Sequence, residues 1–158
     1  MVDNELIFED SNGNLVVVMN NVVKSLFSHR QLHRFSKESA GVLIGERRGS
    51  HIVICDLSEP GPGDVRSRFR VNRKGPHHQD KVDAEFVQSG GTRQYIGEWH
   101  SHPEDSPSPS SIDKYSWKRS IDSSSPMLVL IVGRKTIWMG KKIGSSIIQL
   151  KQTINSTP

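Results

Sequence analysis

The sequence has one cysteine and lacks any long apolar run. Because Cys55 is alone among 158 residues, no disulfide can form within the chain and a zinc site built on several thiolates is excluded. A metal would therefore need His, Asp or Glu ligands. No apolar run approaches the roughly 20 residues of a membrane-spanning helix, and the acidic first residues lack the basic start and apolar centre of a signal peptide. We therefore expect a soluble, cytoplasmic protein with no membrane partner.

Apolar residues are scarce, but they are clustered. The hydrophobic fraction is only 34%, which is below the usual range. The runs 15–19 and 127–132 are nevertheless typical of buried strands, and they argue against disorder. A chain of 158 residues has the length of one compact domain. We therefore predict a single domain over residues 1–158.

Local patterns predict a chain in which strands and helices are mixed. Strands are predicted at 5–8, 15–19, 40–47, 51–58, 66–74, 93–102, 127–132, 136–142 and 146–151, and helices are predicted to begin near 22, 76 and 111. The first helix includes His33 in its spacing, and the second is expected to bury Val82 and Phe86. Residues 152–158 resemble a frayed polar tail. With no repeat or linker, the order of elements predicts an α/β or α+β domain whose mixed sheet is flanked by helices.

Basic residues outnumber acidic ones, giving a net charge of +4. An acidic partner is favoured by this excess, and nucleic acid remains an alternative. In the predicted strand 66–74, alternation places Arg66, Arg68 and Arg70 on one face. These arginines form either a solvated strand face or a surface that guides an acidic substrate.

Two histidines at the end of a predicted strand offer a metal site. His100 and His102 leave the same strand face with Cα atoms about 6.6 Å apart, so both imidazoles can reach one ion. The pair alone is weak, because strand histidines are usually surface or hydrogen-bonded residues. The loop that follows can bring Asp113 beside them as a third ligand. Such a site leaves a fourth position open for water, as a hydrolase requires.

The residues around this pair allow more than one interpretation. Ser110 and Asp113 also match a helix-capping pattern, and the two roles are compatible. For the base, Glu38, Glu98 and Glu104 compete. Glu98 shares the strand face of the histidines, whereas Glu104 lies in a loop and is expected to be solvated. The sequence spacing of Glu38 does not decide its place in space.

Two further features are interpreted as structural. His77 and His78 stand at a predicted helix start and are assigned capping or solvent roles, because adjacent helical residues diverge. Cys55 lies in a run typical of a buried strand, so we expect it to pack in the core.

The motifs together resemble a known family. Glu38-Ser-Ala-Gly-Val-Leu-Ile-Gly45, then His100-Ser-His-Pro103, seven residues, Ser110, two residues and Asp113 resemble the signature of the JAMM (MPN-plus, JAB) metalloproteases. The resemblance covers about residues 36–132. Within the family, Gly97–Pro103 and Ser106–Ser110 are most similar to small bacterial JAMM peptidases that accompany the CD-NTase of CBASS anti-phage operons. The resemblance implies a JAB/MPN domain with a cytidine-deaminase-like, mainly antiparallel mixed sheet.

The resemblance also implies residue roles. His100, His102 and Asp113 would hold one zinc ion with a catalytic water, Glu38 would accept the water's proton, and Ser110 would help to hold the developing oxyanion. A secondary role for Glu98 stays open.

The implied reaction is hydrolysis of the amide bond between the C-terminal tail of a ubiquitin-like conjugated protein and a target lysine. In the CBASS members the conjugated protein is the CD-NTase. Three alternatives remain: a JAMM peptidase that trims a precursor or sulfur-carrier tail, a non-catalytic binding module, and a nucleic-acid protein similar to RadC. The last lacks support, because the sequence offers no helix-hairpin-helix extension.

Overall fold

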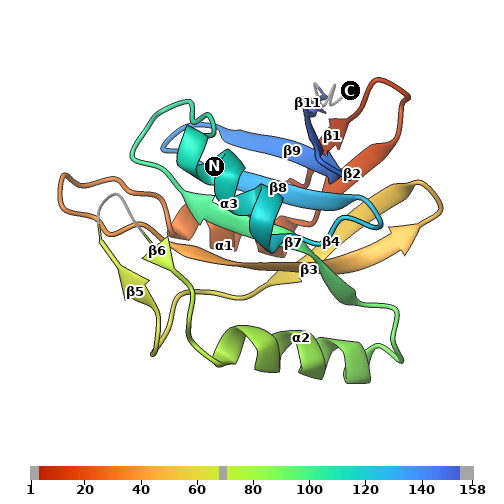
Figure 1. The fold of residues 1–158 in the computed structure, drawn as a ribbon, viewed down its shortest axis with the longest axis horizontal. Coiled ribbons are helices and arrows are strands. Elements are labelled where there is room, and N and C mark those ends of the chain that lie inside the picture. The colour runs from red at the N-terminus through yellow and green to blue at the C-terminus, as the bar shows by residue number, and fades with distance from the viewer. Residues whose placement is uncertain (1–3, 68–70, 154–158) are drawn as a thin grey trace.

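A nine-stranded mixed sheet dominates the computed structural model, which describes residues 4–67 and 71–153 (Figure 1). Its strands are β1 (Leu6–Glu9), β2 (Leu15–Val18), β3 (Ala40–Arg48), β4 (His51–Leu57), β7 (Gln94–Ser101), β8 (Met127–Val132), β9 (Ile137–Ile143), β10 (Ser146–Gln149) and β11 (Lys151–Gln152). The remaining elements are the hairpin β5 (Val65–Arg66) and β6 (Val71–Asn72) and the helices α1 (Asn20–Ser28), α2 (His77–Gln88) and α3 (Ser111–Ser120). The α/β prediction is confirmed.

The strand order is β10-β9-β8-β7-β3-β4-β2-β1-β11. The pairs β2–β4 and β7–β8 are parallel, and the other pairs in the sheet are antiparallel, which confirms a mixed, mainly antiparallel sheet.

Strand β8 explains why helices cover both faces of the sheet. All six of its residues are apolar and buried. Leu128 and Leu130 point into the cluster that contains Leu26 of α1, whereas Val129 points into the cluster that contains Trp117 of α3. Helices α1 and α3 therefore lie on opposite faces of the sheet (Figure 1). A strand that is apolar on both faces requires such double cover.

The two ends of the sheet meet. Strands β10 and β11 stand at opposite ends of the strand order, yet only Leu150 separates them in the chain. The sheet must therefore curl on itself. Leu150 is buried and donates its N–H to the carbonyl oxygen of Met139. Across the same seam, the buried Lys141 Nζ lies 2.9 Å from Asp10 Oδ2.

The ion pair at the seam predicts a pH-dependent stability. Burial alone raises the pKa of Asp10, but hydrogen bonds from Lys141 and from the main chain of Asn14 and Asn12 outweigh it and lower the pKa to about 2. A depressed carboxyl pKa stabilises the fold above the ordinary value and loses that effect as the pH falls through the folded value. After discounting for solvent screening, we expect Asp10→Asn to lower the free energy of unfolding by about 1 kcal/mol at pH 7.

Urea unfolding of both proteins between pH 7 and pH 2.5 measures this effect. The two free energies should converge as the pH approaches the folded pKa of Asp10. A constant difference across this range would mean that the Asp10 charge does not stabilise the seam.

Three predictions about local structure are wrong. The run 66–74 is not one strand, because β5 and β6 pair with each other as a hairpin; Arg68 and Arg70 lie outside the described residues. Helix α1 ends at Ser28, so His33 is not part of it. At the carboxyl end, Gln152 pairs with Phe8 in the sheet rather than starting a frayed tail.

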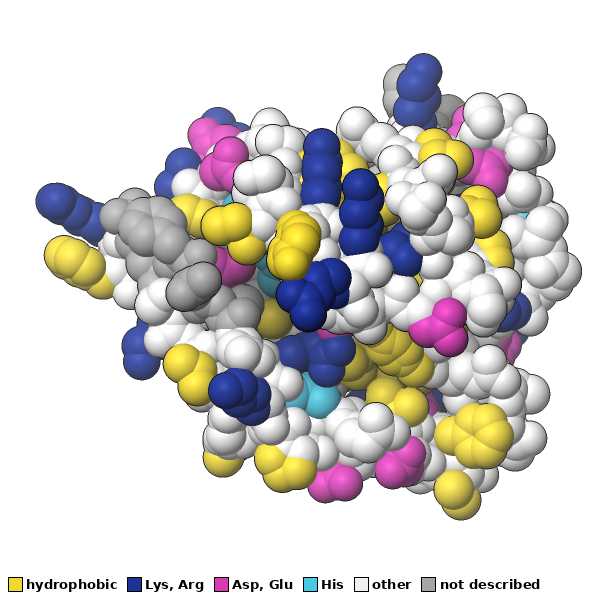
Figure 2. Space-filling view, in the orientation of Figure 1, with side chains coloured by type: hydrophobic (Ala, Val, Ile, Leu, Met, Phe, Trp, Pro, Cys, Tyr) yellow, Lys and Arg dark blue, Asp and Glu magenta, His cyan; other side chains and the backbone are white. Residues whose placement is uncertain are grey.

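Helix α2 also contradicts its predicted packing. Phe86 is 48% exposed and Val82 is only half-buried. The residues buried by α2 are His78 and Glu85, which bond to Ser58 and Arg93. This helix therefore docks through polar contacts, and hydrophobic side chains remain exposed at its carboxyl end (Figure 2).

None of the helices within residues 4–67 and 71–153 has the length and apolar character needed to cross a membrane.

Candidate metal centre and cleft

The register between β3 and β7 brings Glu38 to the histidines. Ala40 pairs with His100 in this antiparallel ladder. Glu38 lies two residues before Ala40, and His102 lies two residues after His100. In an antiparallel pair, Glu38 is therefore placed opposite His102. One ligand atom from each of Glu38, His100 and His102 lies within 4.8 Å of the other two. Glu38 and His100, which are 62 positions apart in the sequence, are thus brought together by sheet pairing.

Helix α3 brings Asp113 to the same place. Its two carboxylate oxygens lie 3.3 Å from His100 Nε2 and 3.1 Å from His102 Nε2. The helix starts with a capping box: Asp113 N donates to Ser110 Oγ at 3.1 Å, and Ser110 N donates to Asp113 Oδ2 at 2.9 Å. Asp113 therefore serves the cap and faces the histidines at once, as the sequence allowed.

The three side chains fit a metal ion. The Nε2 atoms of His100 and His102 are 3.1 Å apart. Ligand atoms held at 2.0–2.1 Å around a tetrahedral ion are separated by about 3.3 Å. This is close to the distance between the two Nε2 atoms and to the distance from each Nε2 to one Asp113 oxygen. Imidazole and carboxylate are suitable ligands for such an ion.

Glu104 orients one of these histidines. Its Oε1 lies 2.8 Å from Nδ1 of His102, so Nε2 of His102 is directed toward Asp113. A carboxylate on the outer nitrogen is typical of metal-bound histidine. Burial lowers the pKa of His102, but hydrogen bonds to Asp113 and Glu104 outweigh it and raise the pKa. Although half-exposed, Glu104 is thus engaged with the site, a contact that the sequence did not predict.

The carboxyl groups of the site differ in acidity. Burial raises the pKa of Glu38, which is only 7% exposed, to about 7. Burial also acts on Asp113, but hydrogen bonds to His100 and His102 hold its pKa well below the usual range. Glu98 is paired with Arg73, whose Nε donates to Glu98 Oε1 at 2.6 Å. Among the three carboxylates considered as base, Glu38 is the one grouped with both histidines.

A buried hydroxyl joins the two strands that carry the site. Ser101 Oγ accepts from Ser39 N and donates to Gln31 Oε1, both at 2.8 Å. Ser101 N in turn donates to the carbonyl oxygen of Ser39. The residue between the two histidines is therefore bonded to the residue after Glu38. Sequence spacing could not reveal this link, although a polar residue between two strand histidines is a signal for it.

We predict that Ser101→Ala lowers the free energy of unfolding by about 2 kcal/mol, because a buried hydroxyl that makes two hydrogen bonds is lost. Urea unfolding measures the change. Ser28→Ala is a matched control, because the Ser28 hydroxyl is exposed and its one bond within the described part of the chain is to Ser25 of its own helix. Equal stabilities for Ser101→Ala and Ser28→Ala would contradict the prediction.

The site opens into a cleft with a volume of about 870 Å³. Its lining includes Glu38, Glu98, His100 and Asp113, and it also includes Arg66 of β5. Figure 2 shows this face of the molecule, on which Lys and Arg side chains gather over α3. His100, Asp113 and the buried carboxyl group of Glu38 are thus in reach of an extended ligand.

Comparison with known proteins agrees with the fold. The family described as prokaryotic homologs of the JAB domain matches residues 20–141. A CD-NTase/cGAS isopeptidase of Vibrio cholerae serotype O1 is 59% identical over 142 residues, which cover 90% of this chain and 91% of that protein. A CD-NTase/cGAS isopeptidase of Escherichia coli strain TW11681 is 56% identical over 153 residues, covering 97% and 98%.

The solution structure of protein DSY2949 from Desulfitobacterium hafniense superposes with a TM-score of 0.62 at 18% identity, covering 84% of this chain and 87% of that one. At this identity the likeness shows the fold alone. The chain belongs to the prokaryotic JAB family, the bacterial branch of the JAMM proteins. It is a hydrolase of the isopeptidase type that acts on a protein substrate, and its site is built to hold a metal ion.

Proposed function

We propose that the chain is a zinc-dependent isopeptidase whose metal ligands are His100, His102 and Asp113. The observation that carries the proposal is the convergence of these three side chains at 3.1–3.3 Å beside the buried Glu38. Two imidazoles and one carboxylate leave the fourth position of a tetrahedral ion open, as in catalytic zinc sites. Zinc bound there would polarise an amide carbonyl and lower the pKa of its water from about 15.7 to about 7.

Glu38 moves the proton. Its carboxylate accepts a proton from the attacking water, and burial favours the protonated form that results. The protonated carboxyl group then donates to the leaving amine as the amide bond breaks. A carboxyl group with a pKa near neutrality suits both steps.

Ser110 is proposed to stabilise the developing oxyanion. Its Oγ accepts from Asp113 N, and the hydroxyl hydrogen has no acceptor among residues 4–67 and 71–153. The hydroxyl is therefore free to donate to a charged oxygen placed beside Asp113. Its place at the α3 cap fixes it relative to Asp113.

The proposed substrate is a CD-NTase joined through its C-terminal tail to a target lysine. The Vibrio and Escherichia relatives, which match over most of their length, are named for that activity. Reversal of such conjugation would place the chain in CBASS anti-phage defence, in the cytoplasm. The reaction is an amide hydrolysis that yields a free tail carboxylate and a free lysine amine.

Incubation of the purified, zinc-loaded chain with a CD-NTase–lysine conjugate tests the proposal. The expected products are the intact CD-NTase and the unmodified target, identified by intact mass. A linear precursor with a short extension after the tail, and a sulfur-carrier precursor, serve as competing substrates. Preference for either of these would assign the chain to tail trimming, and cleavage after full metal removal would exclude the zinc mechanism.

A further inference from the structure

The hairpin β5–β6 holds the main chain of Glu38 through Arg66. Arg66 Nε donates to the carbonyl oxygen of Glu38, and Arg66 Nη2 donates to Ser39 Oγ, both at 2.8 Å. On the other side, Glu38 N donates to the carbonyl oxygen of Ser67 at 2.6 Å. Both main-chain polar groups of Glu38 therefore bond to the hairpin. Glu38 lies outside β3, which begins at Ala40, so the strand itself supplies neither bond.

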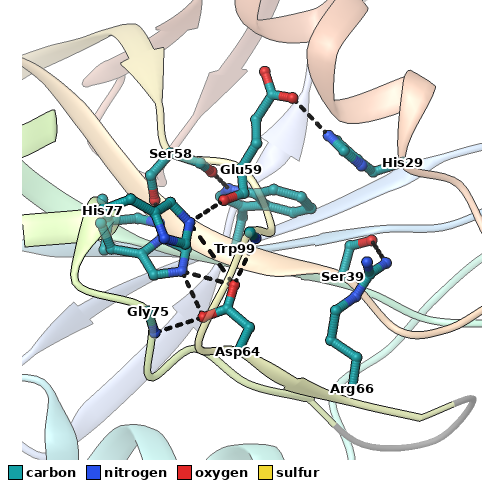
Figure 3. A network of polar contacts seen from close by, with 12 residues as sticks. His29, Ser39, Ser58, Glu59, Asp64, Arg66, Gly75, His77 and Trp99 are labelled. Carbon is teal, nitrogen blue, oxygen red and sulfur yellow. Dashed lines mark hydrogen bonds and ion pairs between the residues drawn. The ribbon is translucent and has the colours of Figure 1, made fainter.

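A buried carboxylate closes the base of the same hairpin (Figure 3). Asp64 immediately precedes β5, and its side chain is fully buried. It accepts from Gly75 N at 2.8 Å, where the chain leaves β6, and from Gly61 N at 3.0 Å. His78 Nε2 lies 3.0 Å from both Asp64 oxygens, and His78 Nδ1 lies 2.5 Å from Ser58 Oγ. We name Ser58, Asp64 and His78 the clasp.

The clasp also bonds to β3 and β7, the two strands beside the site. Ser58 Oγ accepts from Val42 N of β3 at 2.8 Å. The carbonyl oxygen of Ser58 accepts from Trp99 Nε1 at 2.9 Å, and Trp99 precedes His100 in β7. His78 itself is only 2% exposed, contrary to the predicted capping or solvent role. The clasp thus fixes the hairpin against both strands that carry the site.

Hydrogen bonds account for this cluster as a structural clasp, and a second metal site is the alternative that the experiment below tests. Asp64, His77 and His78 lie close enough to hold an ion. However, His78 Nε2 faces a carboxylate, and His77 Nε2 faces the carbonyl oxygen of Glu59 at 2.6 Å. The carbonyl oxygen of Glu59 requires hydrogen on His77 Nε2, so this nitrogen offers no lone pair to a metal, and His77 Nδ1 has no hydrogen-bond partner among the described residues. Burial lowers the pKa of His78, which agrees with a neutral ring that donates at Nε2 and accepts at Nδ1.

We propose that Arg66 is a positioning residue for Glu38 and that the clasp holds Arg66 in place. The inference rests on the proposed function, in which Glu38 moves the proton. It assigns Arg66 a role different from the substrate contact predicted for the basic run. Two of the three guanidinium nitrogens of Arg66, Nε and Nη2, are bonded to Glu38 and Ser39, which fixes the guanidinium group beside the main chain of Glu38.

Steady-state kinetics of Arg66→Ala tests the proposal. Displacement of a reacting group by about 1 Å can cost about 100-fold in rate. We expect kcat to fall by about 10- to 100-fold, with KM within about twofold and metal content unchanged. Arg66→Lys, which retains one donor, should recover part of kcat. Arg48→Ala is the matched control, because Arg48 is exposed on β3 and, among the described residues, its side chain pairs with Glu46 alone.

A raised KM with unchanged kcat in Arg66→Ala would overturn the proposal in favour of substrate docking. Wild-type values of both kcat and KM would show that Arg66 has no role in the reaction. Hydrogen exchange of the peptide 36–41 gives a readout that does not need turnover. Faster exchange in Arg66→Ala than in Arg48→Ala supports positioning, and equal exchange overturns it. A chain that fails to cleave any conjugate while showing this difference would contradict the proposed function alone.

His78→Leu tests the clasp. The variant should reproduce the kcat loss of Arg66→Ala, and the double variant should lose little more, because both changes release the same hairpin. If the losses in kcat of the two single variants add in the double variant, the clasp and Arg66 act independently. Elemental analysis decides the alternative: two metal ions per chain in the parent and one in His78→Leu would overturn the clasp.

Discussion

Glu38→Gln is expected to lower kcat by about 10²- to 10⁴-fold, the usual contribution of a positioned general base, while the metal stays bound. The amide has the size of the carboxyl group but cannot accept the water's proton. Because Glu38 is buried and its pKa is raised to about 7, loss of its charge should not destabilise the fold. Single-turnover cleavage of the conjugate, elemental analysis and thermal unfolding measure the three properties.

Glu98→Gln is the matched control for this experiment. Glu98 also lines the cleft, but Arg73 holds its carboxylate. We expect a loss in kcat of less than about tenfold, well below the loss for a general base. The opposite ranking, with turnover retained in Glu38→Gln and lost in Glu98→Gln, would move the base to Glu98.

Asp113→Asn is expected to weaken zinc binding by more than about 100-fold. Removing a residue that only hydrogen-bonds to a metal ligand lowers metal affinity about 10- to 100-fold. In Asp113→Asn a charged ligand itself is lost, so the effect should be larger. The helix cap should survive, because the Asn side-chain oxygen can still accept from Ser110 N. Competition with a chromophoric chelator measures affinity, and far-UV circular dichroism checks the helix.

Ser110→Ala separates the cap from the ligand. It removes the hydroxyl that accepts from Asp113 N, which should cost about 1 kcal/mol of stability, yet it leaves both Asp113 oxygens. Zinc affinity should therefore fall far less in Ser110→Ala than in Asp113→Asn. Equal zinc affinities in the two variants would mean that Asp113 acts only as a cap.

Several features could be predicted from sequence because they depend on nearby residues. The apolar run 127–132 predicted a strand, and the structure has β8 there. Ser110 and Asp113 predicted a capping box, which depends on atoms three residues apart. His100 and His102 share a strand face for the same local reason, the two-residue period of a strand.

Tertiary pairing decided what sequence spacing left open. The choice among Glu38, Glu98 and Glu104 could not be made from residues alone, since it depends on the register of β3 against β7. Helix α2 buries His78 and Glu85 instead of Phe86 because its partners on other elements are polar, and a helix pattern does not state what will face it.

The sequence by itself determined the local chemistry of this protein: two imidazoles on one strand face, a capped helix that begins with a carboxylate, and the signature that identifies the JAB family. Only the tertiary structure decided which groups surround that chemistry. It folds the basic run back as a hairpin, directs Arg66 to Glu38 and buries His78 against Asp64. The physical reason is that covalent spacing limits only near neighbours, whereas hydrogen bonding and burial between distant segments depend on how the whole chain packs.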